Sequence, residues 1–126
     1  MKLSVLMAIK SIICILFGLS FLLVPELIMS IYGVTLDASG TVMARFLGAT
    51  FVILSITLWF GRNDSGSETL RGFVLGIFIG DSIGFVVALI AQLSGIMNVL
   101  GWAIVALWFL LAAGFGYFQF TLPRKA

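Results

Sequence analysis

One carboxylate lies near the middle of a long apolar stretch, and it is the residue of this sequence best placed to do chemistry. Asp81 falls inside residues 70–93, a segment long enough to cross a bilayer. A carboxylate at the centre of such a segment costs roughly 2.5 to 3.5 kcal/mol to insert, so it must be protonated, paired or turned toward a polar cavity. Three roles follow for Asp81: handling a proton or cation, contacting a ligand headgroup, or forming an internal ion pair.

A second unusual charge, Arg45, lies about one turn inside another apolar segment, residues 41–60. If the two segments form a hairpin, a rise of about 1.5 Å per residue places Arg45 about 23 Å and Asp81 about 16 Å above its cytoplasmic end. The difference of about 7 Å is within reach of an arginine side chain. We predict an intramembrane Arg45–Asp81 pair that fixes packing, with proton or cation handling by Asp81 as the alternative.

Lys10 lies in the amino-terminal half of the first apolar segment. A lysine near a helix end can extend its ammonium group to the lipid headgroups. We interpret Lys10 as an anchor of this kind, with a functional role as the alternative. Lys10, Cys14 and Gly18 share one helical face, and we expect that narrow face to turn toward the other helices.

Small residues recur at every fourth position of residues 70–93. Four of them are glycines: Gly72, Gly76, Gly80 and Gly84. In a membrane helix such a row lets another backbone approach closely. We expect these helix-packing glycines to contact a neighbouring helix of the same chain, and a homodimer seam is the alternative.

The composition identifies the class of protein. Of the 126 residues, 62% are hydrophobic and 10% charged, whereas soluble domains are about half apolar and about a quarter charged. Four apolar runs, residues 4–24, 41–60, 70–93 and 99–120, are each long enough to cross about 30 Å of hydrocarbon. The connections are short, so we predict one domain, residues 1–126, that forms an all-α, membrane-embedded four-helix bundle without a separate catalytic module. The tight connection after residue 93 makes the last two spans antiparallel neighbours.

A short amphipathic segment separates the first two spans. Pro25 ends the first span, and residues 26–32 are too few to cross the membrane. Gly33 follows directly and suits a left-handed helix cap. We predict a short interfacial helix here.

The basic residues indicate topology. They lie at the amino end, between the second and third spans, and at the tail (Lys2, Lys10, Arg62, Arg71, Arg124, Lys125), whereas residues 25–40 and 94–98 contain no Lys or Arg. The positive-inside rule then places both termini in the cytoplasm. Because these residues are scattered, they do not resemble a nucleic-acid surface. We expect the lipid bilayer as partner and no nucleic acid.

Several catalytic classes lack their usual residues. The chain contains no His and a single Cys, so we expect no zinc, haem or iron–sulfur site and no cofactor. Catalysis by a nucleophile and base lacks its usual base. The acidic residues are dispersed and suggest no paired-carboxylate site. We therefore expect no enzyme.

Residues 22–40, LLVPELIMSIYGVTLDASG, and residues 44–51, ARFLGATF, resemble small bacterial four-helix inner-membrane proteins of the DoxX-like group. The resemblance covers roughly the first half of the chain. It implies the four-helix fold and a bacterial inner membrane. Some members of that group are small subunits in quinone-dependent sulfur oxidation, but no residue here matches a redox site, so the resemblance implies the fold and not the activity.

Two classes of function remain. The first is a non-enzymatic accessory subunit or self-associating scaffold, working as a homo-oligomer or within a larger membrane complex. The alternative is a small transporter or proton-coupled carrier that uses Asp81.

Overall fold

The computed structural model describes residues 1–122, and within this range the regular structure is entirely helical. The helices are α1 Leu3–Leu23, α2 Pro25–Ile31, α3 Ala38–Gly61, α4 Glu68–Leu93 and α5 Gly101–Thr121. All except α2 are long and apolar enough to cross a membrane. These helices confirm the predicted all-α fold with four spans and a short helix between the first two. Arg124 and Lys125, which entered the topology argument, lie outside the described residues.

Local sequence signals account for where the helices begin. The Asp37 carboxylate accepts a hydrogen bond from the Gly40 amide at 2.7 Å and caps α3. The Ser67 hydroxyl accepts from the Leu70 amide at 3.1 Å and caps α4. Pro25 is the first residue of α2, a position where a backbone N–H would have no hydrogen-bond partner within the helix, so its absence in proline costs nothing. The chain leaves α2 through Gly33, whose φ of 77° is the left-handed conformation predicted for it.

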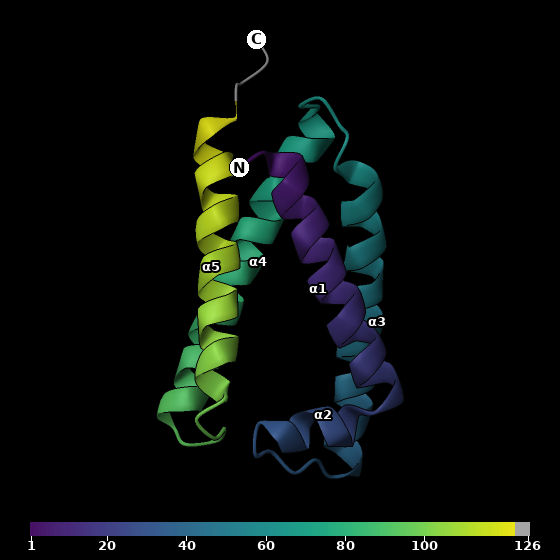
Figure 1. Ribbon diagram of the computed structural model, residues 1–126, viewed down its shortest axis with the longest axis vertical. Helices are drawn as coiled ribbons and strands as arrows, with labels where there is room; N and C mark the ends of the chain where they lie inside the picture. Colours follow the sequence, from purple (N-terminus) through teal and green to yellow (C-terminus); the bar gives the residue numbers. More distant parts are fainter. Residues whose placement is uncertain (123–126) are drawn as a thin grey trace.

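The four long helices form two antiparallel pairs. Helix α1 packs on α3, and α4 packs on α5, as predicted for the last two spans. The pairs lie close together at the end that holds the amino terminus and the α3–α4 connection, and they diverge toward the end that holds α2 (Figure 1). We call these the narrow end and the wide end. This arrangement leaves space between the pairs in the wide half of the molecule.

The pairing of α3 with α1 corrects the hairpin of the second and third spans on which the Arg45–Asp81 prediction depended. At the α1–α3 crossing, a Cβ added to Gly48 would lie 2.7 Å from the Gly18 carbonyl oxygen. The Ser11 hydroxyl donates to the Ser55 carbonyl at 2.7 Å, and the Ser55 hydroxyl donates to the Ser11 carbonyl at 2.8 Å. Small residues and reciprocal hydrogen bonds of this kind hold membrane helices together.

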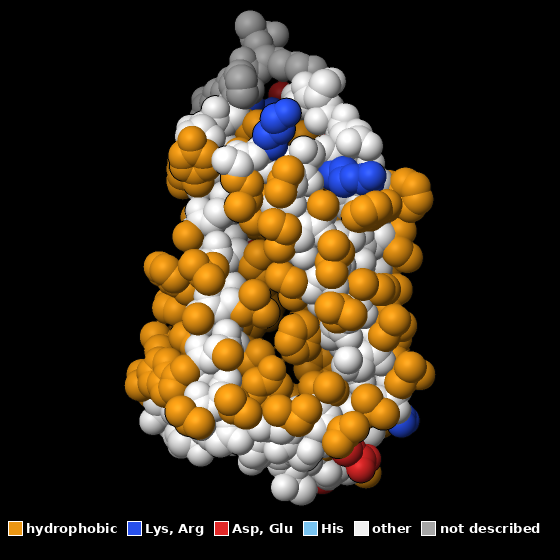
Figure 2. Space-filling view, viewed as in Figure 1, with side chains coloured by type: hydrophobic (Ala, Val, Ile, Leu, Met, Phe, Trp, Pro, Cys, Tyr) orange, Lys and Arg blue, Asp and Glu red, His pale blue; other side chains and the backbone are white. Residues whose placement is uncertain are grey.

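The core that joins the two pairs is at the narrow end. Its fully buried large side chains are Phe115, Met7, Leu58 and Val74, which come from all four long helices. Away from this core, apolar side chains cover the middle of the molecular surface, and most charged side chains lie toward its ends (Figure 2). Such a surface fits a hydrocarbon environment, and the chain is a small multi-pass membrane protein.

Candidate functional site

A buried ion pair connects the two helix pairs. The Lys10 Nζ on α1 donates to the Asp81 Oδ1 on α4 at a distance of 2.5 Å. Each residue is only 3% exposed. A buried charge without a partner is strongly destabilising, so each of these residues depends on the other.

The structure does not bring Arg45 and Asp81 together, and it corrects the partner of the carboxylate to Lys10. Arg45 is exposed on α3. It lies about 40° to 60° around the helix from the buried line of Thr41 and Gly48, at about 100° per residue. The similar depths of Arg45 and Asp81 in the membrane were compatible with an ion pair. The packing of α3 on α1, however, leaves Arg45 on the exposed side of α3.

Lys10 does not extend to the lipid headgroups as interpreted from the sequence. Lys10 shares a helical face with Cys14 and Gly18, and this face was predicted to turn toward the other helices. All three residues are buried, so the helical face indicated the position of Lys10 correctly. Two aromatic rings of α5 lie beside the ammonium group, with the Nζ 5.8 Å from the ring centroids of both Trp108 and Phe115. Rings at this distance attract a cation.

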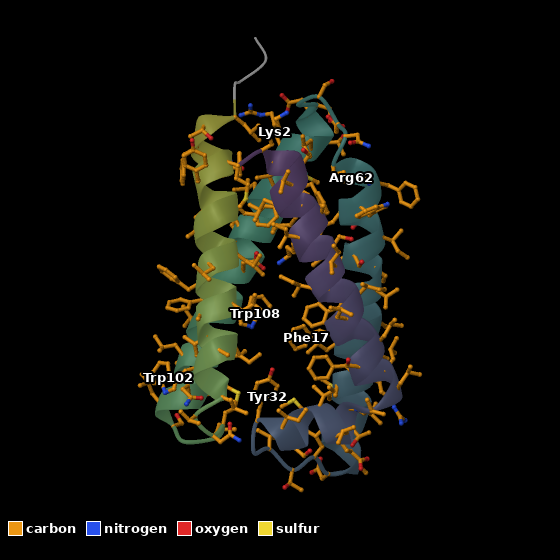
Figure 3. All side chains as sticks on the ribbon, in the orientation of Figure 1. Lys2, Phe17, Tyr32, Arg62, Trp102 and Trp108 are labelled. Carbon is orange, nitrogen blue, oxygen red and sulfur yellow. The ribbon has the colours of Figure 1, made fainter. Side chains whose placement is uncertain are left out.

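A cavity of about 540 Å³ lies between the two helix pairs. Its lining is almost entirely apolar and includes Phe17, Phe21, Phe51, Ala88, Leu107 and Trp108. Phe17 on α1 and Trp108 on α5 lie on opposite sides of the space between the pairs (Figure 3). Among the described residues that line the cavity, Lys10 is the one charged side chain. The lining therefore combines a large apolar surface with a cationic group.

Contacts close the cavity at both ends. The ion pair and the core close the narrow end, while Tyr32, directly after α2, reaches into the space at the wide end (Figure 3). The Asn98 amide donates to the Tyr32 carbonyl at 2.8 Å, and the Asn98 side chain donates to the Ile31 carbonyl at 3.0 Å. These bonds tie α2 to the α4–α5 connection. Between the two ends the surface is hollowed (Figure 2), so the cavity opens sideways through an apolar surface.

The glycine row of α4 has two different environments. Gly84 packs directly against the Trp108 ring, which is the internal contact predicted for the row. Gly72, Gly76 and Gly80 are exposed, and a Cβ added to any of them would have no atom of another described helix within 4 Å. Within residues 1–122 the expected internal contact is therefore absent at these three glycines, and their face of α4 is open.

No family model, curated protein or solved structure matches this chain. Among residues 1–122, no group of three or more His, Cys, Asp or Glu side chains is placed to hold a metal ion. The geometry of the cavity and of the open glycine face therefore carries the functional argument.

Proposed function

We propose that this chain is a non-catalytic accessory or scaffold protein of the membrane that holds an apolar molecule between its two helix pairs. The observation that carries the proposal is the cavity of about 540 Å³ and its apolar lining. Ligand pockets in proteins occupy about 300–1,000 Å³ and are lined mainly by apolar and aromatic side chains with few polar groups. This cavity has the same size and character.

The direction of access supports a ligand drawn from the bilayer. The narrow end is filled by core side chains, and the wide end is tied by the hydrogen bonds of Asn98. The hollowed side, in contrast, lies in the apolar part of the surface (Figure 2). An apolar molecule can enter from the hydrocarbon without crossing water.

The open face of α4 supports the scaffold part of the proposal. Gly72, Gly76 and Gly80 offer a surface on which another helix can approach closely, either from a second copy or from a larger complex. We further propose a bacterial inner membrane with both termini in the cytoplasm. The positive-inside distribution supports this topology, and the resemblance to the DoxX-like group supports this membrane.

A cavity-filling variant tests the proposal. Ala91 lines the cavity from α4, whereas Ala49 is exposed on α3 outside the lining. We expect native mass spectrometry of protein extracted in mild detergent to show a retained apolar molecule on the wild type and on the matched control Ala49→Phe. Ala91→Phe should reduce its occupancy at least about tenfold, because a phenyl ring takes up the bound volume. Equal occupancy in the two variants would contradict the proposal.

A proton-coupled carrier that uses Asp81 is the second candidate. The observation that favours it is the Asp81 Oδ2, which is buried without a hydrogen-bond partner among the described residues. Because Asp81 and Lys10 lie on different helix pairs, separation of the pairs would free the carboxylate. Because Asp81→Asn alone leaves Lys10 buried and unpaired, the test combines Asp81→Asn with Lys10→Met. Proton flux into liposomes that this folded double variant abolishes would favour the carrier, and the same flux in both proteins would exclude a role for Asp81.

A further inference from the structure

We infer that the molecule held in the cavity is a single-chain lipid with a small, uncharged head that accepts a hydrogen bond from Lys10. This inference rests on the proposed function, since it assigns the class of ligand to the same cavity. It commits to one arrangement, with the head at the narrow end beside Lys10 and the chain extending toward α2.

The ammonium group of Lys10 has spare hydrogen-bond donors that can take a further acceptor in the cavity. A lysine ammonium group has three N–H donors. Among the described residues Lys10 has a single hydrogen-bond acceptor, the Asp81 Oδ1. Lys10 is 3% exposed and lines the cavity, and no second side chain of the described residues accepts from the remaining donors. Buried donors without partners are unfavourable, and a ligand oxygen beside Lys10 would satisfy them.

The charge balance of the site selects an uncharged head. Lys10 and Asp81 together are neutral when ionised. A phosphate or carboxylate beside them would leave one cation between two anions in an apolar site, where excess charge is strongly unfavourable. A cationic head would lie against the Lys10 ammonium and be repelled. A hydroxyl or carbonyl group accepts the hydrogen bond without adding charge.

The volume of the cavity fits one chain. A volume of about 540 Å³ lies in the middle of the range of about 300–1,000 Å³ for small-molecule pockets, which suits one hydrocarbon chain with a small head. Phe17 and Trp108 face the space from opposite sides and supply flat apolar surfaces along the chain.

Three ligands with the same chain test the inference. Purified protein in mixed micelles is given 1-hexadecanol, hexadecane or hexadecyl phosphate at equal mole fraction, and occupancy is counted by native mass spectrometry. We expect hexadecanol to bind at least about tenfold more tightly than either of the others, because a hydrogen bond to a charged donor is among the stronger ones.

A charge-free variant shows whether Lys10 is responsible. Lys10→Met alone leaves Asp81 buried and unpaired, so the informative variant combines Lys10→Met with Asp81→Leu, which replaces the pair by apolar side chains of similar size. We expect this double variant to bind hexadecanol and hexadecane equally. The exposed Lys2 supplies the control, and Lys2→Met should retain the preference for hexadecanol.

The outcomes separate this inference from the proposed function. If all three chains bind the wild type equally, the head assignment is overturned while the apolar binding site stands. Preferred binding of hexadecyl phosphate would identify an anionic ligand and also overturn it. If none of the three binds and no apolar molecule is retained on purification, both the inference and the proposed function fail.

Discussion

Lys10 on α1 and Asp81 on α4 connect the two helix pairs through an ion pair with an Nζ–Oδ1 distance of 2.5 Å. The pair lies where the core of the narrow end meets the cavity, and Lys10 belongs to the lining of that cavity. The same contact therefore joins the two halves of the fold and presents a cation to the space between them. Removing one charge should affect folding, whereas removing both should mainly affect what the cavity binds.

Asp81→Asn should destabilise the protein strongly. The substitution leaves the Lys10 ammonium buried without a counter-ion, which typically costs about 3–5 kcal/mol. Thermal unfolding in mild detergent, followed by circular dichroism, measures the effect. Arg45→Gln is the matched control, because Arg45 is exposed and its charge is not needed for packing. Similar melting temperatures for the two variants would show that the ion pair does not hold the helix pairs together.

Much of the architecture could be predicted because the hydrophobic pattern determines it. The structure contains three features that have a local physical cause in the sequence: the four apolar runs, the break at Pro25 and the left-handed conformation of Gly33. The partner of Asp81 was not predictable in the same way. Arg45 and Lys10 are both long cations at compatible depth, and the choice between them depends on which helices pack together.

Helix pairing itself follows from small contacts that are far apart in the sequence. Gly18 and Gly48 allow α1 and α3 to approach closely, and the Ser11–Ser55 hydrogen bonds join the same two helices. A sequence shows that such residues share one face of a helix, but it does not show which other helix packs against that face. For the same reason the row of glycines on α4 predicted close packing without showing that, within residues 1–122, Gly84 is the member of the row that meets another helix.

Gly48→Ala should weaken the α1–α3 pair. The added methyl group would lie 2.7 Å from the Gly18 carbonyl oxygen and 3.0 Å from the Leu22 amide nitrogen, and backbone atoms cannot move aside cheaply. Overpacking of this kind costs about 1–3 kcal/mol. Gly76→Ala adds the same group to an open face and should not lower the melting temperature. The comparison is made by thermal unfolding of both variants in the same detergent, and equal stability would contradict the close crossing.

The open face of α4 gives a prediction about association. Gly76→Ile with Gly80→Ile places bulky side chains where, among the described residues, no atom of another helix lies within 4 Å of the new Cβ atoms, so the monomer should fold normally. Close helix contact between copies should be lost, because backbone approach requires small residues. Energy transfer between labelled copies in liposomes measures this, and we expect at least about a threefold fall in the dimer fraction. Ala106→Ile, on an exposed position of α5, is the control and should leave the dimer fraction unchanged.

Asn98→Ala should loosen the wide end of the cavity while leaving the narrow end intact. The Asn98 side chain donates to the Ile31 carbonyl at 3.0 Å, and its loss removes one of the two hydrogen bonds between α2 and the α4–α5 connection. A typical hydrogen bond contributes about 0.5–1.5 kcal/mol, so the remaining backbone bond to the Tyr32 carbonyl should open more often. Hydrogen exchange at the backbone amide of residue 98 should then accelerate about two- to tenfold, with exchange around Phe115 unchanged. Asn63→Ala in the exposed α3–α4 connection is the control, and equal exchange in both variants would show that the wide end is held by other contacts.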